Sequence, residues 1–68
     1  MRISARDVLP GTVTAVERGA ITSHVQIDVG GQVVTASITN AATDDLGLAL
    51  GERAYAVVKA SGVRVGKN

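Results

Sequence analysis

The 68-residue sequence predicts an all-β domain with one short helix, arranged as a five-stranded OB-like barrel. The apolar residues, 46% of the chain, are almost all Val, Ala, Ile and Leu, which suit strands that pack on both faces. Between residues 21 and 29, side chains alternate between a mostly apolar face and a polar face, which is the period of a strand. Helix signals occur in one short segment, so we expect a helix between the third and fourth strands.

Three strands are expected in the first part of the chain. Residues 11–16 are short or β-branched and end at the turn Glu17-Arg18-Gly19, which marks the first strand. The alternating segment 21–29 is the second strand. Gly30-Gly31 can adopt the positive φ angles of a two-residue hairpin, so residues 32–39 are expected to pair back as the third strand.

A short helix is expected after the third strand. Asn40 is a residue type that caps helices well, and Gly47 is the type that commonly follows their last turn. The helix is therefore expected from residue 41 to residue 46. Leu48 and Leu50 are then expected to fill the core.

The last part of the chain is expected to add two strands. Residues 53–60 follow the turn at Gly51-Glu52 and form the fourth strand. Ser61-Gly62 interrupts the pattern, and residues 63–65 form a short fifth strand. Residues 1–68 are thus expected to form a single domain.

A chain of this size has a small core and usually needs additional stabilisation. It has no cysteine for disulfides, and His24 is its only histidine, which leaves too few ligands for a structural zinc site. We therefore expect a homo-oligomer, in which the abundant apolar surface forms an interface.

Charge and hydropathy argue against several classes of partner. The formal net charge is +1 and the seven basic residues are scattered, which disfavours a nucleic-acid partner. There is neither a long apolar run nor a signal-peptide pattern, so we expect no membrane partner and a cytoplasmic location. No known nucleophile and base spacing and no Gly-rich phosphate loop occur, so we expect no enzyme, no catalytic residue and no catalytic cofactor.

Two triplets near opposite ends of the chain, Ser4-Ala5-Arg6 and Lys59-Ala60-Ser61, each combine a cation with a hydroxyl. Such groups donate strong hydrogen bonds to an oxyanion, and neither triplet contains a carboxylate that would repel one. Residues two apart in an extended segment lie on one side, so each triplet can present both groups together. The simpler interpretation is that Arg6 and Lys59 are ordinary solvated side chains.

Several spaced motifs occur along the chain, and they are Ser4-Ala5-Arg6-Asp7, Pro10-Gly11-Thr12-Val13, Gly19-Ala20-Ile21-Thr22, Ile38-Thr39, Leu46-Gly47-Leu48 with Gly51, and Tyr55-Ala56-Val57-Val58-Lys59-Ala60-Ser61. In content and order they resemble the motifs of the molbindins, small molybdate-binding proteins built from a Mop, or TOBE, domain. The resemblance extends from about residue 2 to residue 65 and implies the same barrel.

The resemblance also implies which residues bind the oxyanion. The implied set is Ser4, Ala5, Arg6, Thr39, Lys59, Ala60 and Ser61, and a possible second oxyanion site contains Gly19, Thr22 and Ser23. No metal ligand is implied, because molybdenum is bound as molybdate. Two departures from the family pattern stand out. Asp7 replaces the usual Asn, and Ala41, Ala42 and Thr43 stand where relatives often have a further Ser.

By resemblance, the protein binds molybdate, and tungstate as well, for storage and homeostasis. It is expected to be a homohexamer, a trimer of dimers. Because the two triplets are far apart in sequence, Ser4 and Arg6 of one subunit are expected to complete the site of a neighbour. Two alternatives remain open at this stage: a non-catalytic assembly or regulatory module, and an OB-fold nucleic-acid binder. The second is disfavoured because Tyr55 is the only aromatic residue available for base stacking.

Overall fold

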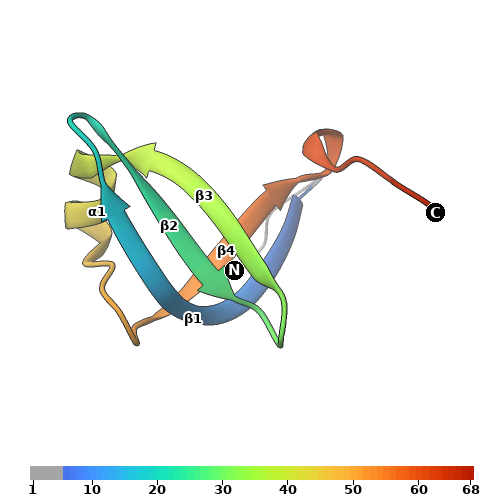
Figure 1. Ribbon diagram of the computed structural model, residues 1–68, viewed down its shortest axis with the longest axis horizontal. Helices are drawn as coiled ribbons and strands as arrows, with labels where there is room; N and C mark the ends of the chain where they lie inside the picture. Colours follow the sequence, from blue (N-terminus) through green and yellow to red (C-terminus); the bar gives the residue numbers. More distant parts are fainter. Residues whose placement is uncertain (1–5) are drawn as a thin grey trace.

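The computed structural model describes residues 6–68, with the side chains described from residue 7 onward. The fold is mostly β with one short helix, as the sequence predicts (Figure 1). Its elements are β1 (Arg6–Arg18), β2 (Thr22–Asp28), β3 (Val33–Thr39), α1 (Asn40–Leu46), β4 (Arg53–Lys59) and the 3₁₀ turn η1 (Ala60–Gly62).

The four strands form one antiparallel sheet in the order β3-β2-β1-β4. The 13-residue strand β1 is central: its first half pairs with β4 and its second half with β2. It bends strongly in between, so the sheet curls upon itself (Figure 1). A register shift between Val13 and Ala15 marks an irregularity of the β-bulge type near the bend, and such irregularities increase local twist and curvature.

The core lies inside this curl and consists of small branched side chains. Val13, Val25, Ile27 and Ala56 are buried, and Leu48 packs against them from the segment after the helix. Along β2 the predicted alternation is confirmed, because Ser23, Val25 and Ile27 are buried while the residues between them are exposed. Ile21 departs from that pattern: it lies in the turn before β2 and is 75% exposed.

The short helix is confirmed, but its cap is not the predicted one. Thr39, rather than Asn40, is the N-cap, and its Oγ1 accepts a hydrogen bond from the Ala42 backbone N–H at 3.1 Å. Asn40 is the first helical residue. Gly47 ends the helix in the left-handed conformation with φ 64°, as expected. Leu50 is 70% exposed, so its predicted place in the core is wrong.

Two strand predictions also differ from the structure. The first strand begins at residue 6 instead of residue 11, because its initial segment pairs with β4 over seven positions. Residues 63–65 form no strand in the described part of the chain. The chain turns at Ala60–Gly62 and then runs away from the sheet (Figure 1). The described residues therefore contain four strands, and β3 and β4 are the two edges of a curled but open sheet.

Candidate functional site

The pairing of β1 with β4 brings two cationic residues together. Arg6 lies directly opposite Lys59, and Asp7 lies opposite Val58. Residues at opposite positions of an antiparallel pair lie on the same face of the sheet, with Cβ atoms about 5 Å apart. The two residues are far apart in sequence and adjacent in the fold. Ser4 and Ala5, also predicted at this site, lie outside the described residues.

The turn that follows Lys59 adds the predicted hydroxyl to the same end of the molecule. Ala60, Ser61 and Gly62 form the 3₁₀ turn η1, which is closed by a hydrogen bond from Val63 N to Ala60 O at 3.2 Å. Lys59, Ala60 and Ser61 are all exposed. Arg6, which pairs with Lys59, and the exposed residues Lys59, Ala60 and Ser61 are here called the β1–β4 cluster, at the end of the sheet.

The β1–β4 cluster has the chemistry of an anion site. Like charges at directly opposite positions on neighbouring strands are destabilising. An anion bound between them removes this repulsion and gains charge-assisted hydrogen bonds from the guanidinium and ammonium groups. The neighbouring Asp7 is exposed and carries the opposite charge, so it opposes anion binding.

A second group of predicted residues lies at the far end of β1. Thr22 pairs with Thr39, and Ser23 pairs with Arg18, the last residue of β1. Gly19 N donates to Thr22 O at 2.7 Å and closes the turn between β1 and β2. The members of this group, here called the turn cluster, are Gly19, Thr22, Ser23 and Thr39.

Asn40 connects the turn cluster, and sequence reasoning missed this role. Its backbone N donates to Ile21 O at 2.8 Å, and its Nδ2 donates to Gly19 O at 3.0 Å. The hydroxyl of Ser23 donates to Asn40 Oδ1. The only sequence signal for this role is the presence of an Asn directly after a Thr that can cap the helix. The sequence analysis assigns the cap to Asn40 itself.

The hydroxyls of the turn cluster differ in what they can offer a ligand. Ser23 is fully buried and its hydroxyl proton is donated to Asn40. Thr39 is exposed, and although its Oγ1 accepts from Ala42, a hydroxyl can accept and donate at the same time. Thr43, one of the residues that stand where relatives often have a further Ser, is buried and donates to Thr39 O at 3.1 Å.

Within one chain, the structure therefore separates Thr39 from Arg6 and Lys59, with which it was predicted to share an oxyanion site, and places it beside Thr22. Arg6 and Arg18 are the two ends of the 13-residue strand β1, so Thr39 and Lys59 lie at opposite ends of the sheet. A single chain does not bring Thr39 to the β1–β4 cluster. It does bring Arg6 to Lys59, so the distance between those residues in sequence does not require a second subunit to join them.

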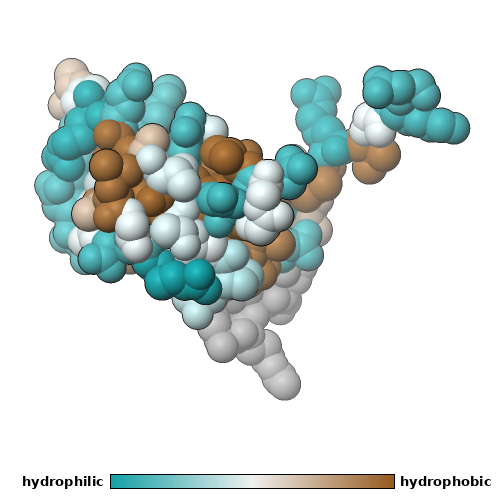
Figure 2. Space-filling view, turned by 60° about the horizontal axis from the view of Figure 1, so that its bottom comes forward, coloured by the Kyte–Doolittle hydropathy of each residue, from teal (hydrophilic) through white to brown (hydrophobic). Residues whose placement is uncertain are grey.

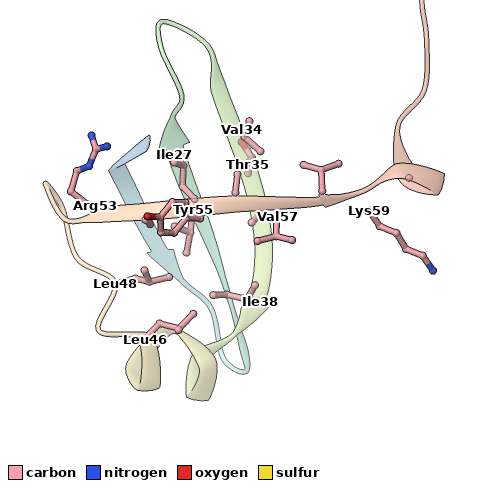
Figure 3. A pocket seen from close by; sticks show the side chains of 16 residues that line it. Ile27, Val34, Thr35, Ile38, Leu46, Leu48, Arg53, Tyr55, Val57 and Lys59 are labelled. Carbon is pink, nitrogen blue, oxygen red and sulfur yellow. The ribbon is translucent and has the colours of Figure 1, made fainter. Parts of the chain in front are cut away.

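A large open groove lies between the two edges of the sheet (Figure 3). Its volume is about 820 Å³, and side chains of β2, β3 and β4 line most of it together with Leu46 and Leu48. Arg53 and Lys59, the first and last residues of β4, are the charged residues among its lining. Lys59 thus belongs both to the β1–β4 cluster and to the rim of the groove.

No group of three or more His, Cys, Asp or Glu side chains within the described residues could hold a metal ion. No helix within the described part of the chain is both long enough and apolar enough to cross a bilayer.

Comparisons with known proteins agree with one another. Residues 3–65 match the family described as the TOBE domain. The chain is 43% identical over 67 residues to a probable molybdenum-pterin-binding protein of Haemophilus influenzae, and the match covers 97% of each protein.

Two solved structures have the same fold. A molybdate-binding protein from Sporomusa ovata superimposes with a TM-score of 0.91 at 34% identity, over 98% of this chain and 100% of that one. The cytoplasmic molybdate-binding protein ModG, with molybdate bound, gives a TM-score of 0.86 at 43% identity, over 91% of this chain and 45% of ModG.

Proposed function

This chain belongs to the TOBE domain family, and from that membership we propose that it binds molybdate, and tungstate as well, as an intact tetrahedral dianion. The protein stores and buffers the oxyanion in the cytoplasm and does not convert it chemically. The similarity to proteins described as molybdate-binding supports the ligand. The register of β1 with β4, which sets Arg6 opposite Lys59, is the observation that best supports this binding site.

Each residue of the β1–β4 cluster has a role in this proposal. Arg6 and Lys59 neutralise the two charges of the dianion, and Ser61 donates a neutral hydrogen bond. The small side chain of Ala60 leaves the backbone amides of the turn accessible. Ser4 and Ala5, which precede Arg6, supply a further hydroxyl and a further amide. The protein uses no catalytic cofactor to bind the oxyanion.

Lys59, Ala60 and Ser61 of the cluster are exposed in one chain, and this favours a site completed by a second subunit. An oxyanion held at an exposed surface competes with water for every hydrogen bond, whereas an enclosed one does not. We place the site between subunits of a homohexamer built as a trimer of dimers. Thr39 of a neighbouring subunit can then reach the oxyanion, although Thr39 of the same chain lies at the other end of the sheet.

Gly19, Thr22 and Ser23 of the turn cluster are proposed as the second oxyanion site. Gly19 and Thr22 are exposed and lie in or beside the turn between β1 and β2. Ser23 contributes by fixing Asn40, and through Asn40 the turn, rather than by touching the ligand. This second site gives a stoichiometry above one oxyanion per chain.

A calorimetric titration of the purified protein with molybdate tests the function, with tungstate as a second ligand and sulfate as the control at equal ionic strength. We expect saturable binding of molybdate and tungstate at micromolar concentration or below. Sulfate has the same charge and shape but shorter bonds, so it cannot reach every hydrogen-bond donor of the site. Each buried donor left unpaired weakens sulfate binding by about 1 to 3 kcal/mol. Equal heats for molybdate and sulfate would reject selective binding. No heat with any of the three would reject oxyanion binding and favour the assembly module.

A further inference from the structure

The outer face of the sheet carries a row of three polar side chains that neither proposed oxyanion site uses. β2 lies between β1 and β3 (Figure 1), and His24 on β2 is directly opposite Glu17 on one side and Ser37 on the other. Because Ser23 and Val25, the neighbours of His24 along the strand, are buried inside the curl, this row points away from the core. A carboxylate, an imidazole and a hydroxyl are therefore aligned across three strands.

The three side chains of this row are exposed and unpaired. Glu17, His24 and Ser37 are all open to solvent. Within the described residues, none of the three makes a side-chain hydrogen bond or an ion pair. Apolar surface is also open to solvent on the body of the molecule (Figure 2), so a wholly polar row is a property of this place rather than of the surface in general.

The spacing between Glu17 and His24 suits a metal ion held by two side chains. Residues at opposite positions of an antiparallel pair have Cβ atoms about 5 Å apart. An imidazole nitrogen and a carboxylate oxygen each bind Zn²⁺ at about 2.0 to 2.2 Å, so the two donor atoms must approach to about 3 Å. Rotation about the side-chain bonds of a Glu opposite a His brings them to this distance, and the backbone does not have to move.

The local charge also favours a cation at this row. Glu17 supplies a negative charge, and Gln26, the next outer-face residue of β2, is uncharged. Arg18 follows Glu17 in the chain but lies on the other face, because it is opposite the buried Ser23. Its guanidinium contacts the carboxylate of Asp44 at 2.8 Å, which holds this positive charge away from the row.

We propose that Glu17 and His24 bind a divalent late transition-metal ion, Cu²⁺ or Zn²⁺, on the outer face of the sheet. Imidazole is a ligand for both ions, and the carboxylate neutralises part of their charge. Water completes the coordination, because both side chains are exposed. Two protein ligands make an exchangeable site, which differs from the four-ligand structural zinc site that the sequence excludes.

Ser37 is a positioning residue of this site. A histidine that binds a metal through one ring nitrogen usually donates a hydrogen bond from the other. Ser37 lies on the side of His24 away from Glu17, so its hydroxyl accepts that hydrogen bond and orients the metal-binding nitrogen toward the carboxylate.

Because His24 is the only histidine of the chain, every imidazole signal reports on this site. The purified protein is titrated with Cu²⁺ in a buffer that does not bind metals, and its electron paramagnetic resonance is recorded. We expect one Cu²⁺ per chain, with nitrogen hyperfine structure from one imidazole. Zn²⁺ is expected to shift the ring protons of His24 in ¹H NMR spectra, whereas Mg²⁺, which prefers oxygen ligands, should leave them unchanged.

Variants of the row separate the ligands from the positioning residue. Ser37→Ala is expected to weaken Cu²⁺ binding about tenfold, as the loss of an outer hydrogen-bond partner usually does, and Ser37→Thr, which keeps the hydroxyl, to restore it. Glu17→Gln is expected to weaken binding by more while the imidazole signal remains. His24→Gln is expected to abolish that signal. The matched control is Asp45→Asn, an exposed carboxylate on α1, which should bind Cu²⁺ as the native protein does.

Two results would overturn the metal site. One is equal Cu²⁺ affinity in the native protein and His24→Gln. The other is an equal loss of affinity in Glu17→Gln and Asp45→Asn, because binding would then depend on overall charge alone. All the substitutions change exposed side chains, and thermal unfolding without metal verifies that each variant folds. The titrations contain no molybdate, so a failure here is distinguishable from a failure of oxyanion binding.

Discussion

Arg6 and Lys59 occupy directly opposite positions where β1 pairs with β4, although 52 residues lie between them in the sequence. Two positive charges at opposite positions of an antiparallel pair oppose the pairing, typically by a few tenths of a kcal/mol to about 1 kcal/mol. Such a pair therefore does not stabilise the sheet by itself. It becomes favourable when an anion binds between the two cations.

The charge pair is tested by removing each cation. Arg6→Ala and Lys59→Ala are each expected to weaken molybdate binding at least tenfold, about 1.4 kcal/mol, because a charge-assisted hydrogen bond to the dianion is lost. Without ligand, each variant is expected to be at least as stable as the native protein, because the repulsion between the paired positions is removed. Calorimetry and thermal unfolding give the two quantities. Arg64→Ala removes the same charge elsewhere and is expected to leave the affinity unchanged, so an equal loss in all three variants would argue against a specific site.

Asp7 is expected to limit the affinity of the β1–β4 cluster. It adjoins Arg6 in the sequence and is exposed. A single negative charge about 7 Å from a dianion raises its free energy by about 1 kcal/mol in water, before screening by salt. Asp7→Asn should therefore bind molybdate several-fold more tightly, most clearly at low ionic strength. The control is Asp45→Asn, an exposed carboxylate on α1, and an affinity gain of the same size there would indicate a general charge effect.

The bend of β1 is expected to depend on Gly11. A Cβ at this position would contact the backbone oxygen of Asp28 and would lie 2.7 Å from Ile27 Cγ2. Gly11→Ala should lower the free energy of unfolding by about 1 to 3 kcal/mol, the usual cost of overpacking. Urea unfolding measures the change. In Gly66→Ala, the added Cβ meets nothing within 4 Å, so the stability of that variant should stay within about 0.5 kcal/mol of native.

The hydrogen bonds of Asn40 are expected to stabilise the turn cluster. Asn40→Ala leaves the fully buried Ser23 hydroxyl and the Gly19 carbonyl without their partner, and an unsatisfied buried group costs about 1 to 3 kcal/mol. Ser23→Ala removes only one of these bonds and should cost less. Ser37→Ala, exposed on β3, serves as the surface control in the same unfolding experiment. If Asn40→Ala were as stable as Ser37→Ala, the network would have no structural role.

Sequence reasoning succeeded where the signal is local. The alternation in β2, the glycine hairpin and the glycine at the end of α1 each depend on a few neighbouring residues, and all three appear in the structure. The same holds for the fold class, because short apolar segments separated by turns leave few arrangements open. Local patterns were less reliable for Asn40 and Leu50, whose surroundings come from distant parts of the chain.

The sequence by itself determined that this chain forms a small, mostly β domain of the TOBE family. It also identified the two charged triplets as candidates for binding an oxyanion. The tertiary structure decided how those residues are grouped: Arg6 beside Lys59, and Thr39 at the far end of β1 with Gly19 and Thr22. It also decided that residues 63–65 leave the sheet. The physical reason is that side-chain periodicity is encoded within a segment. Strand order and register depend instead on packing and hydrogen bonding between segments that are distant in sequence.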